Sequence, residues 1–161
     1  MTAPDVEELE HGDAHEVALQ NAQRKAAAVA RDDVGACVLG ADTVVTAEGK
    51  LHGEASDRSA AAATLRALSG REHLVVTGLC LIDGDSRRMA TAATAVTFRA
   101  IDPRLLEWYL DSGEWRERAG AYAIQGRGAA LVARVDGDYQ NVVGLPLATL
   151  LELEPSLLLG G

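Results

Sequence analysis

A short apolar run that ends in a carboxylate is the feature that most constrains the fold of this chain. Residues 36–41, Ala-Cys-Val-Leu-Gly-Ala, predict a strand buried on both faces of a sheet, and Asp42 follows directly. Ligands of open α/β sheets bind where strands end, so a charged group at that place indicates a functional site. The alternative is that Asp42 caps a turn by accepting backbone N–H groups. The local sequence favours neither interpretation over the other.

The composition is typical of a globular domain. The chain has 161 residues, 48% of them hydrophobic, which predicts a single domain over residues 1–161 with a sizeable core. The first residues do not have the basic and apolar pattern of a leader, and no apolar run is long enough to span a bilayer, so secretion and membrane insertion are not expected. Cys37 and Cys80 lie in apolar runs without metal-ligand spacing, which predicts buried thiols in a reducing cytoplasm.

The net charge argues against a nucleic-acid polymer as partner. The chain carries 15 basic and 24 acidic residues, for a net charge of −9. Such a chain repels a long polyanion such as duplex DNA or RNA. A small phosphorylated ligand is still compatible with this charge, because a few local donors can satisfy it.

The order of the predicted elements indicates an α/β fold, with a mixed twisted central sheet, flanking helices and two lobes around a cleft. Helices are expected from Asp13 to about residue 30, from 56 or 57 to 68, from 103 to just before Gly113, and after Pro146. Besides the strand that leads to Asp42, strands are expected over 73–82 and 89–99, and a hairpin over 129–135 and 139–143.

Two further features are candidates for a site. Lys25 falls at the margin of the apolar stripe of the first helix, where its ammonium could reach a cleft, although a snorkelling surface lysine fits the local pattern better. Residues 118–128 contain three glycines and Gln125. Glycines let a ligand approach the backbone, and an amide can read a donor and an acceptor on a planar base. Loops with this many glycines are nevertheless more often simple turns.

Four segments taken together resemble the Maf family, the septum-formation-inhibitor-like nucleoside triphosphate pyrophosphatases, whose fold is similar to that of inosine triphosphatases. The resemblance runs from about Pro4 to the C-terminus, in the order and spacing of the family. The four segments are Gly-Ala-Asp-Thr-Val-Val at 40–45, residues 65–71, the glycine-rich residues 119–128, and residues 136–147 with Asn-Val-Val-Gly-Leu-Pro.

The resemblance implies hydrolysis of a nucleoside triphosphate at the α phosphorus, giving the monophosphate and pyrophosphate, with Mg²⁺ or Mn²⁺ as the divalent cation. It implies that Asp42 is the proton acceptor, that Glu7 is a second catalytic acid, and that Lys25 lies near the phosphates. Asp42 and Glu7 would also bind the metal. These residue types suit the reaction, since one carboxylate can deprotonate water while another helps to hold a cation.

The resemblance also implies which residues bind the substrate. They are expected to be Thr43, Arg118, Gln125 and Gly126. Thr43 and Gln125 match positions tied to base choice, and this pair looks like the branch that acts on dTTP and UTP and less like the branch that acts on 7-methylguanosine triphosphate. A homodimer is a further expectation from the family, and neither a nucleic-acid polymer nor a membrane is expected as a partner.

Two departures from the family pattern concern the phosphates. Members normally begin with a strand and a Ser-x-Ser-Pro-Arg-Arg loop that helps to cradle the triphosphate, and the chain does not contain this loop. Glu54 stands where the family usually has lysine, so an anion replaces a cation. Each lost charged contact to phosphate costs about 1.5–3 kcal/mol. The alternative hypothesis is therefore a weak or inactive nucleotide-binding or regulatory protein linked to cell division.

Overall fold

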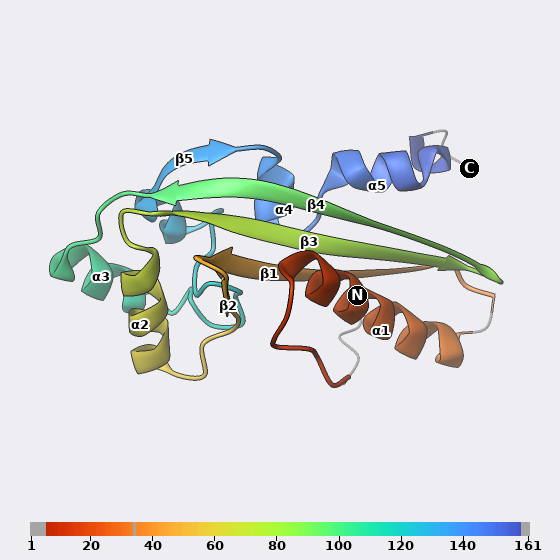
Figure 1. Ribbon diagram of the computed structural model, residues 1–161, viewed down its shortest axis with the longest axis horizontal. Coiled ribbons are helices and arrows are strands. Elements are labelled where there is room, and N and C mark those ends of the chain that lie inside the picture. Colours follow the sequence, from red (N-terminus) through yellow and green to blue (C-terminus); the bar gives the residue numbers. More distant parts are fainter. Residues whose placement is uncertain (1–5, 34, 159–161) are drawn as a thin grey trace.

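The computed structural model describes residues 6–33 and 35–158. Its centre is a five-stranded sheet with the strand order β2-β1-β3-β4-β5 (Figure 1). The strands are β1 (Val38–Ala47), β2 (Lys50–His52), β3 (Glu72–Asp83), β4 (Ser86–Phe98) and β5 (Val132–Asp136). The helices are α1 (Ala14–Asp32), α2 (Arg58–Leu68), α3 (Pro103–Leu110), α4 (Tyr139–Val143) and α5 (Leu147–Leu153), with 3₁₀ turns η1 (Arg127–Leu131) and η2 (Pro155–Leu158). The α/β class is therefore confirmed, and no helix in the described ranges is long and apolar enough to cross a membrane.

The expected mixed sheet is wrong, because every neighbouring pair of strands among the described residues is antiparallel. The reason lies in the connection through α2. This helix carries the chain from β2 to β3, two strands that run in the same direction but lie on opposite sides of β1. Each of them therefore pairs antiparallel with β1, and no parallel neighbours result.

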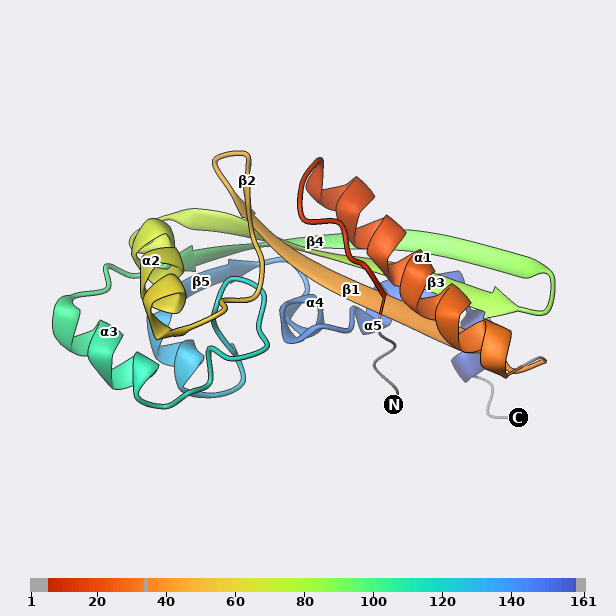
Figure 2. The same ribbon diagram turned by 90° about the horizontal axis from the view of Figure 1, so that it is seen from below.

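Helix α1 lies directly against β1 and β3, because two glycines leave room for its backbone (Figure 2). A Cβ atom at Gly40 would lie 2.2 Å from the carbonyl oxygen of Ala22, and one at Gly78 would lie 2.4 Å from that of Ala18. Asp13 caps the helix by accepting the backbone N–H groups of His15 and Glu16. The close approach brings the polar side chains of α1 within reach of the sheet.

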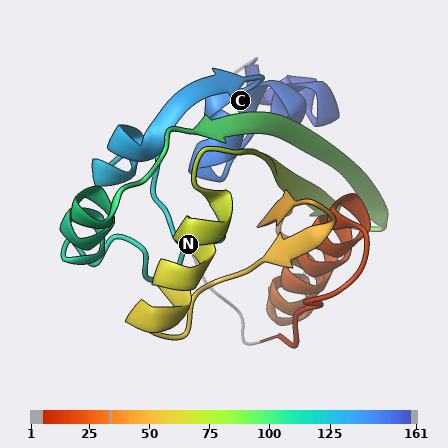
Figure 3. The same cartoon turned by 60° about the vertical axis from the view of Figure 1, so that its left-hand side comes forward.

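The main hydrophobic core lies on the other side of the molecule from α1, where α2 and α3 stand together (Figure 3). Leu65 and Leu68 of α2 pack there with Tyr109 of α3 and with sheet residues such as Val75. Helix α3 begins as predicted, and α2 begins at Arg58, one residue after the later of its two predicted starts. The carboxylates of Asp57 and Asp102 accept backbone N–H groups of the first turns.

The predicted hairpin around Asp136-Gly137 is wrong in its second half. Residues 132–136 form β5, but residues 139–143 form helix α4 instead of a returning strand. Asp138 is the N-cap of this helix and accepts the backbone N–H of Gln140, and this cap outweighs the β-propensity of the following residues.

The cysteines differ in their environment. Cys80 is buried in β3, as expected. Cys37 is exposed, contrary to the prediction, because it precedes β1 and does not lie inside it.

Candidate active site

Asp42 lies near the middle of the ten-residue strand β1, and not at a strand end as expected. Its side chain faces α1 and is 7% exposed. Lys25 Nζ donates to Asp42 Oδ1 at 2.6 Å, and Asn21 Nδ2 donates to Asp42 Oδ2 at 3.2 Å. Both side chains come from α1, whose backbone lies close to the strand because of Gly40 and Gly78. The carboxylate is thus held by helix side chains, and within the described residues no backbone N–H of a turn donates to it.

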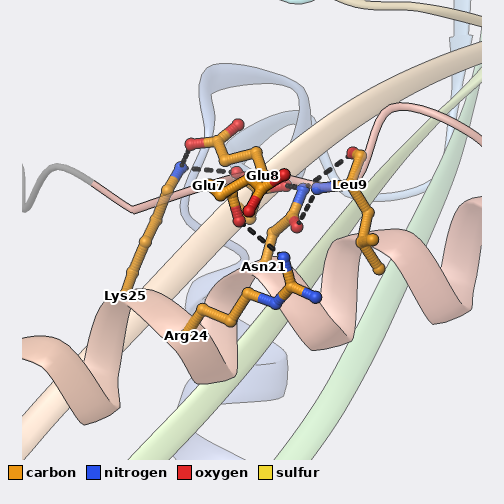
Figure 4. Close-up of polar contacts among 7 residues, drawn as sticks. Glu7, Glu8, Leu9, Asn21, Arg24 and Lys25 are labelled. Carbon is orange, nitrogen blue, oxygen red and sulfur yellow. Dashed lines mark hydrogen bonds and ion pairs between the residues drawn. The ribbon is translucent and has the colours of Figure 1, made fainter.

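The segment before α1 supplies a second carboxylate (Figure 4). The Asn21 amide accepts the N–H of Leu9 at 2.8 Å and donates to the Leu9 carbonyl at 3.2 Å, which fixes this segment against the helix. Glu8 then lies 2.7 Å from Lys25 Nζ. Lys25 therefore bridges Glu8 and Asp42, and its ammonium is held at the cleft and does not snorkel away from it.

The environment shifts the pKa values of this pair. Burial raises the pKa of the Asp42 carboxyl above its ordinary value, and the Lys25 ammonium offsets this only in part. Burial also acts to lower the pKa of Lys25, but the hydrogen bonds to Asp42 and Glu8 outweigh burial and the net pKa is raised. Asp42 is consequently a stronger base than an exposed aspartate, and Lys25 stays charged beside it.

These groups line a cavity of about 630 Å³ that passes around the edge of β1. β2 pairs only with residues 45–47 of β1, so on that side residues 38–44 have no strand partner within the described part of the chain. Asp42, Lys25 and Glu8 line one side of the cavity. The other side is lined by Thr43, Val75, Tyr122 and residues 142–144.

On the second side of the cavity, Tyr122 forms a hydrogen bond with a buried histidine. The hydroxyl of Tyr122 lies 2.9 Å from Nε2 of His73, and both rings pack edge-on against Phe98. Burial lowers the pKa of His73 to about 4 and raises that of Tyr122. Both groups are therefore neutral near pH 7, and Tyr122 lines the cavity while the buried His73 supports it from behind.

The structure brings some of the expected site residues together and leaves others apart. Asp42, Lys25, Thr43 and Arg118 all line the cavity. Glu7 instead lines a separate small hollow beside Arg24, whose guanidinium donates to the Glu7 carbonyl at 2.6 Å. Gln125 and Gly126 are exposed and do not belong to the cavity lining. Gly126 packs instead against the carboxylate of Glu114.

Reasoning from the sequence missed Glu8 and Asn21. The signal for Asn21 was present, because it lies one helical turn before Lys25 and next to the buried Ala22 of the apolar stripe. A buried amide at such a position needs a polar partner. Glu8 had no comparable signal, since the segment before the helix has no period that would separate Glu7 from Glu8.

The cavity carries more acidic than basic side chains. Its acids are Glu8, Glu10, Asp42, Glu54 and Glu117, and its lysine and arginine are Lys25 and Arg118. The replacement at Glu54 thus lies inside the cavity, where a bridge between Glu54 and Ala119 also brings Arg118 to the wall. In the part of the chain that the structure describes, no group of three or more His, Cys, Asp or Glu side chains is placed to hold a metal ion. A metal here would need ligands from the substrate or from water.

Comparison with known proteins identifies the family of this chain. Three relatives carry the name dTTP/UTP pyrophosphatase. The protein of Symbiobacterium thermophilum is 46% identical over 149 residues, which cover 91% of this chain and 77% of the relative. That of Pyrococcus furiosus is 42% identical over 147 residues, with the same coverage of 91% and 77%. That of Moorella thermoacetica is 50% identical over 131 residues, which cover 80% of this chain and 68% of the relative. The family model described as Maf-like protein matches residues 1–154, and the chain therefore belongs to the Maf family.

Proposed function

We propose that the chain hydrolyses dTTP and UTP to the monophosphate and pyrophosphate. The observation that carries this proposal is the buried Asp42 carboxylate beside Lys25 in a cavity of about 630 Å³, a volume that suits a nucleotide. The names of the relatives indicate the same substrates. We take α1 on one side and the core around α2 and α3 on the other as the two lobes of the site. We place the activity in the cytoplasm, where the free thiols of Cys37 and Cys80 persist.

The roles of Asp42 and Lys25 follow from their contacts. Asp42 accepts a proton from the attacking water, and its raised pKa makes it a better base for this step. Lys25 Nζ lies 2.6 Å from the carboxylate, and its side chain is 26% exposed and lines the cavity. It offsets negative charge on the phosphate that reacts.

A divalent cation fits the donors on this side of the cavity. Asp42 and Glu8 offer carboxylate oxygens, the ligand type that Mg²⁺ and Mn²⁺ prefer, and both contact the same Lys25 ammonium. A bound cation supplies charge neutralisation at the phosphates. Of the two neighbouring acids we assign the metal role to Glu8 and not to Glu7, because Glu8 lines the cavity and Glu7 lines a separate hollow.

Replacing Asp42 with asparagine tests the assignment of the base. Asparagine keeps an oxygen toward Lys25 but cannot take a proton, so pyrophosphate release from UTP and dTTP in the presence of Mn²⁺ is expected to fall by about 10²–10⁴-fold. The matched control is Asp136→Asn, which changes an exposed carboxylate that pairs with Arg134 and is expected to keep full activity. Undiminished turnover in Asp42→Asn would reject the role.

The pair Glu8→Gln and Glu7→Gln tests which acid serves the metal. Each variant removes one charge from adjacent residues, so their long-range effects are matched. Glu8→Gln is expected to raise the Mn²⁺ concentration that gives half-maximal activity, while Glu7→Gln leaves it unchanged. The opposite result would return the role to Glu7.

A second candidate function is nucleotide binding with little or no hydrolysis, as in a regulatory protein. The acidic cavity with Glu54 favours it, because Glu54 repels phosphate where the family usually has a cation. Calorimetry that detects UTP binding by a sample without turnover would support this second function. Turnover that depends on Asp42 would exclude it.

A further inference from the structure

The hydroxyl of Thr43 is the polar group of β1 on the side of the cavity away from Asp42. Successive side chains of a strand point to opposite faces, so Thr43 points away from α1. It lies directly across from Thr77 of β3, and the two Oγ1 atoms are 2.8 Å apart. Thr77 is fully buried, and its Oγ1 also lies 3.4 Å from the carbonyl oxygen of Asn141 in α4.

The direction of these hydrogen bonds follows from a count of protons. Thr77 has one hydroxyl proton and two acceptors in reach, Thr43 Oγ1 and the Asn141 carbonyl. If Thr77 donates to the carbonyl, Thr43 donates to Thr77 and both protons are used within the protein. If Thr77 donates to Thr43, only one such bond forms. The first arrangement satisfies more buried groups and is therefore the stable one.

The Asn141 carbonyl, the last acceptor in this series of hydrogen bonds, is fixed in place. Asn141 is fully buried, and its amide donates to the Val75 carbonyl and to Thr94 Oγ1, both at 3.0 Å. Its carbonyl also accepts the N–H of Gly144 at 3.0 Å. The carbonyl that receives the Thr77 proton therefore belongs to a rigid part of the core, and the hydroxyl of Thr43 has no freedom to reverse.

We infer that Thr77 is a positioning residue that holds the Thr43 hydroxyl as a hydrogen-bond acceptor, so that the cavity selects a pyrimidine ring with an N–H group over cytosine. Uracil and thymine carry a proton on N3 and can donate it to Thr43. The N3 atom of cytosine is an acceptor, and two facing acceptors leave each other unsatisfied. This inference rests on the proposed function and adds to it a determinant of base choice that does not touch the substrate.

Thr77→Val tests the inference. Valine has nearly the shape of threonine without the hydroxyl, and the Asn141 carbonyl keeps its bond from Gly144, so the change leaves no buried carbonyl unsatisfied. Thr43 is then free to turn and to donate to cytosine. The ratio of kcat/KM for UTP to that for CTP is expected to fall by about tenfold, chiefly because CTP improves. Thr77→Ser keeps the hydroxyl and is expected to keep the ratio.

The outcomes separate the inference from a purely structural role. An unchanged ratio in Thr77→Val, or an equal loss for UTP and CTP, would overturn it. Thr43→Val provides a second readout. If Thr77 acts through Thr43, adding Thr77→Val to Thr43→Val should not change the ratio of kcat/KM for UTP to that for CTP any further, so the single variant Thr43→Val and the double variant should have the same lowered ratio. If Thr77→Val does not fold, Thr77→Ala removes the same hydroxyl.

Calorimetry with UTP and CTP distinguishes failure of the inference from failure of the proposed function. Suppose that the wild-type chain hydrolyses neither nucleotide but binds UTP more tightly than CTP, and that Thr77→Val lowers the ratio of the two affinities. This result would refute the proposed hydrolysis and support the inference about Thr77. A wild-type chain that binds both equally, or neither, would overturn the inference.

Discussion

Replacing Gly78 with alanine is expected to lower both the free energy of unfolding and the rate of hydrolysis. The new Cβ would lie 2.4 Å from the carbonyl carbon and oxygen of Ala18, which are backbone atoms of α1 and cannot turn aside. Ordinary contact begins at 3.4 Å, so the helix must retreat by about 1 Å. Overpacking of this kind costs about 1–3 kcal/mol. The same shift draws Asn21 and Lys25 away from Asp42, and a displacement of this size can cost about 10²-fold in rate.

The assay is urea unfolding together with pyrophosphate release from UTP. A loss of 1 kcal/mol lowers the urea concentration at the unfolding midpoint by roughly 0.3–1 M, because the free energy of unfolding falls by about 1–3 kcal/mol for each 1 M of urea. Gly53→Ala is the control for unfolding, because a Cβ there meets no atom within 4 Å and Gly53 has no left-handed φ. A Gly78→Ala variant with the unfolding midpoint and kcat/KM of the wild type would refute the idea that close packing on this glycine positions the site.

Two further predictions concern pH. The pKa of His73 is about 4 in the folded chain and 6.5 in the unfolded chain, so its contribution to stability is complete above pH 6.5 and is lost as the pH falls toward 4. This loss of stability amounts to about 3 kcal/mol. Between pH 7 and pH 4.5, the free energy of unfolding in urea should therefore fall less for His73→Phe than for the wild type. An equal fall in both proteins would contradict the reasoning. Lys25→Met removes the cation that lowers the pKa of Asp42, so the acidic limb of the rate profile for UTP should move to higher pH, and a shift to lower pH would be the contrary result.

The helices α1, α2 and α3 could be predicted because their signals are local. Asp13, Asp57 and Asp102 each cap the helix that follows, and the apolar stripe behind each cap needs no knowledge of the rest of the chain. The direction of the strands was not accessible in this way. It depends on which strand lies beside which, and that order is set by long-range packing of α2 and the sheet.

The site could be predicted in part for the same reason. Asp42 and Lys25 stand out from an apolar strand and an apolar stripe, and the structure places them 2.6 Å apart. The choice between Glu7 and Glu8 depends instead on the Asn21 amide, which fixes the register of the preceding segment through Leu9. A contact between residues that lie 12 positions apart leaves no trace in the local pattern.

The edge of β1 would let the proposed hydrolysis and the proposed base choice share one cavity. Asp42 faces α1, whereas its neighbour Thr43 faces Thr77 and α4 on the opposite side of the sheet. Within a wide sheet, strands on both sides would separate these two faces. Here β2 leaves β1 after residues 45–47, and in the described residues no other strand pairs with this edge of residues 38–44. A ligand that passes around the edge therefore meets the carboxylate at one end and the hydroxyl at the other. A nucleoside triphosphate has the same division, with reacting phosphates at one end and a base at the other, so the uncovered edge suits this class of substrate.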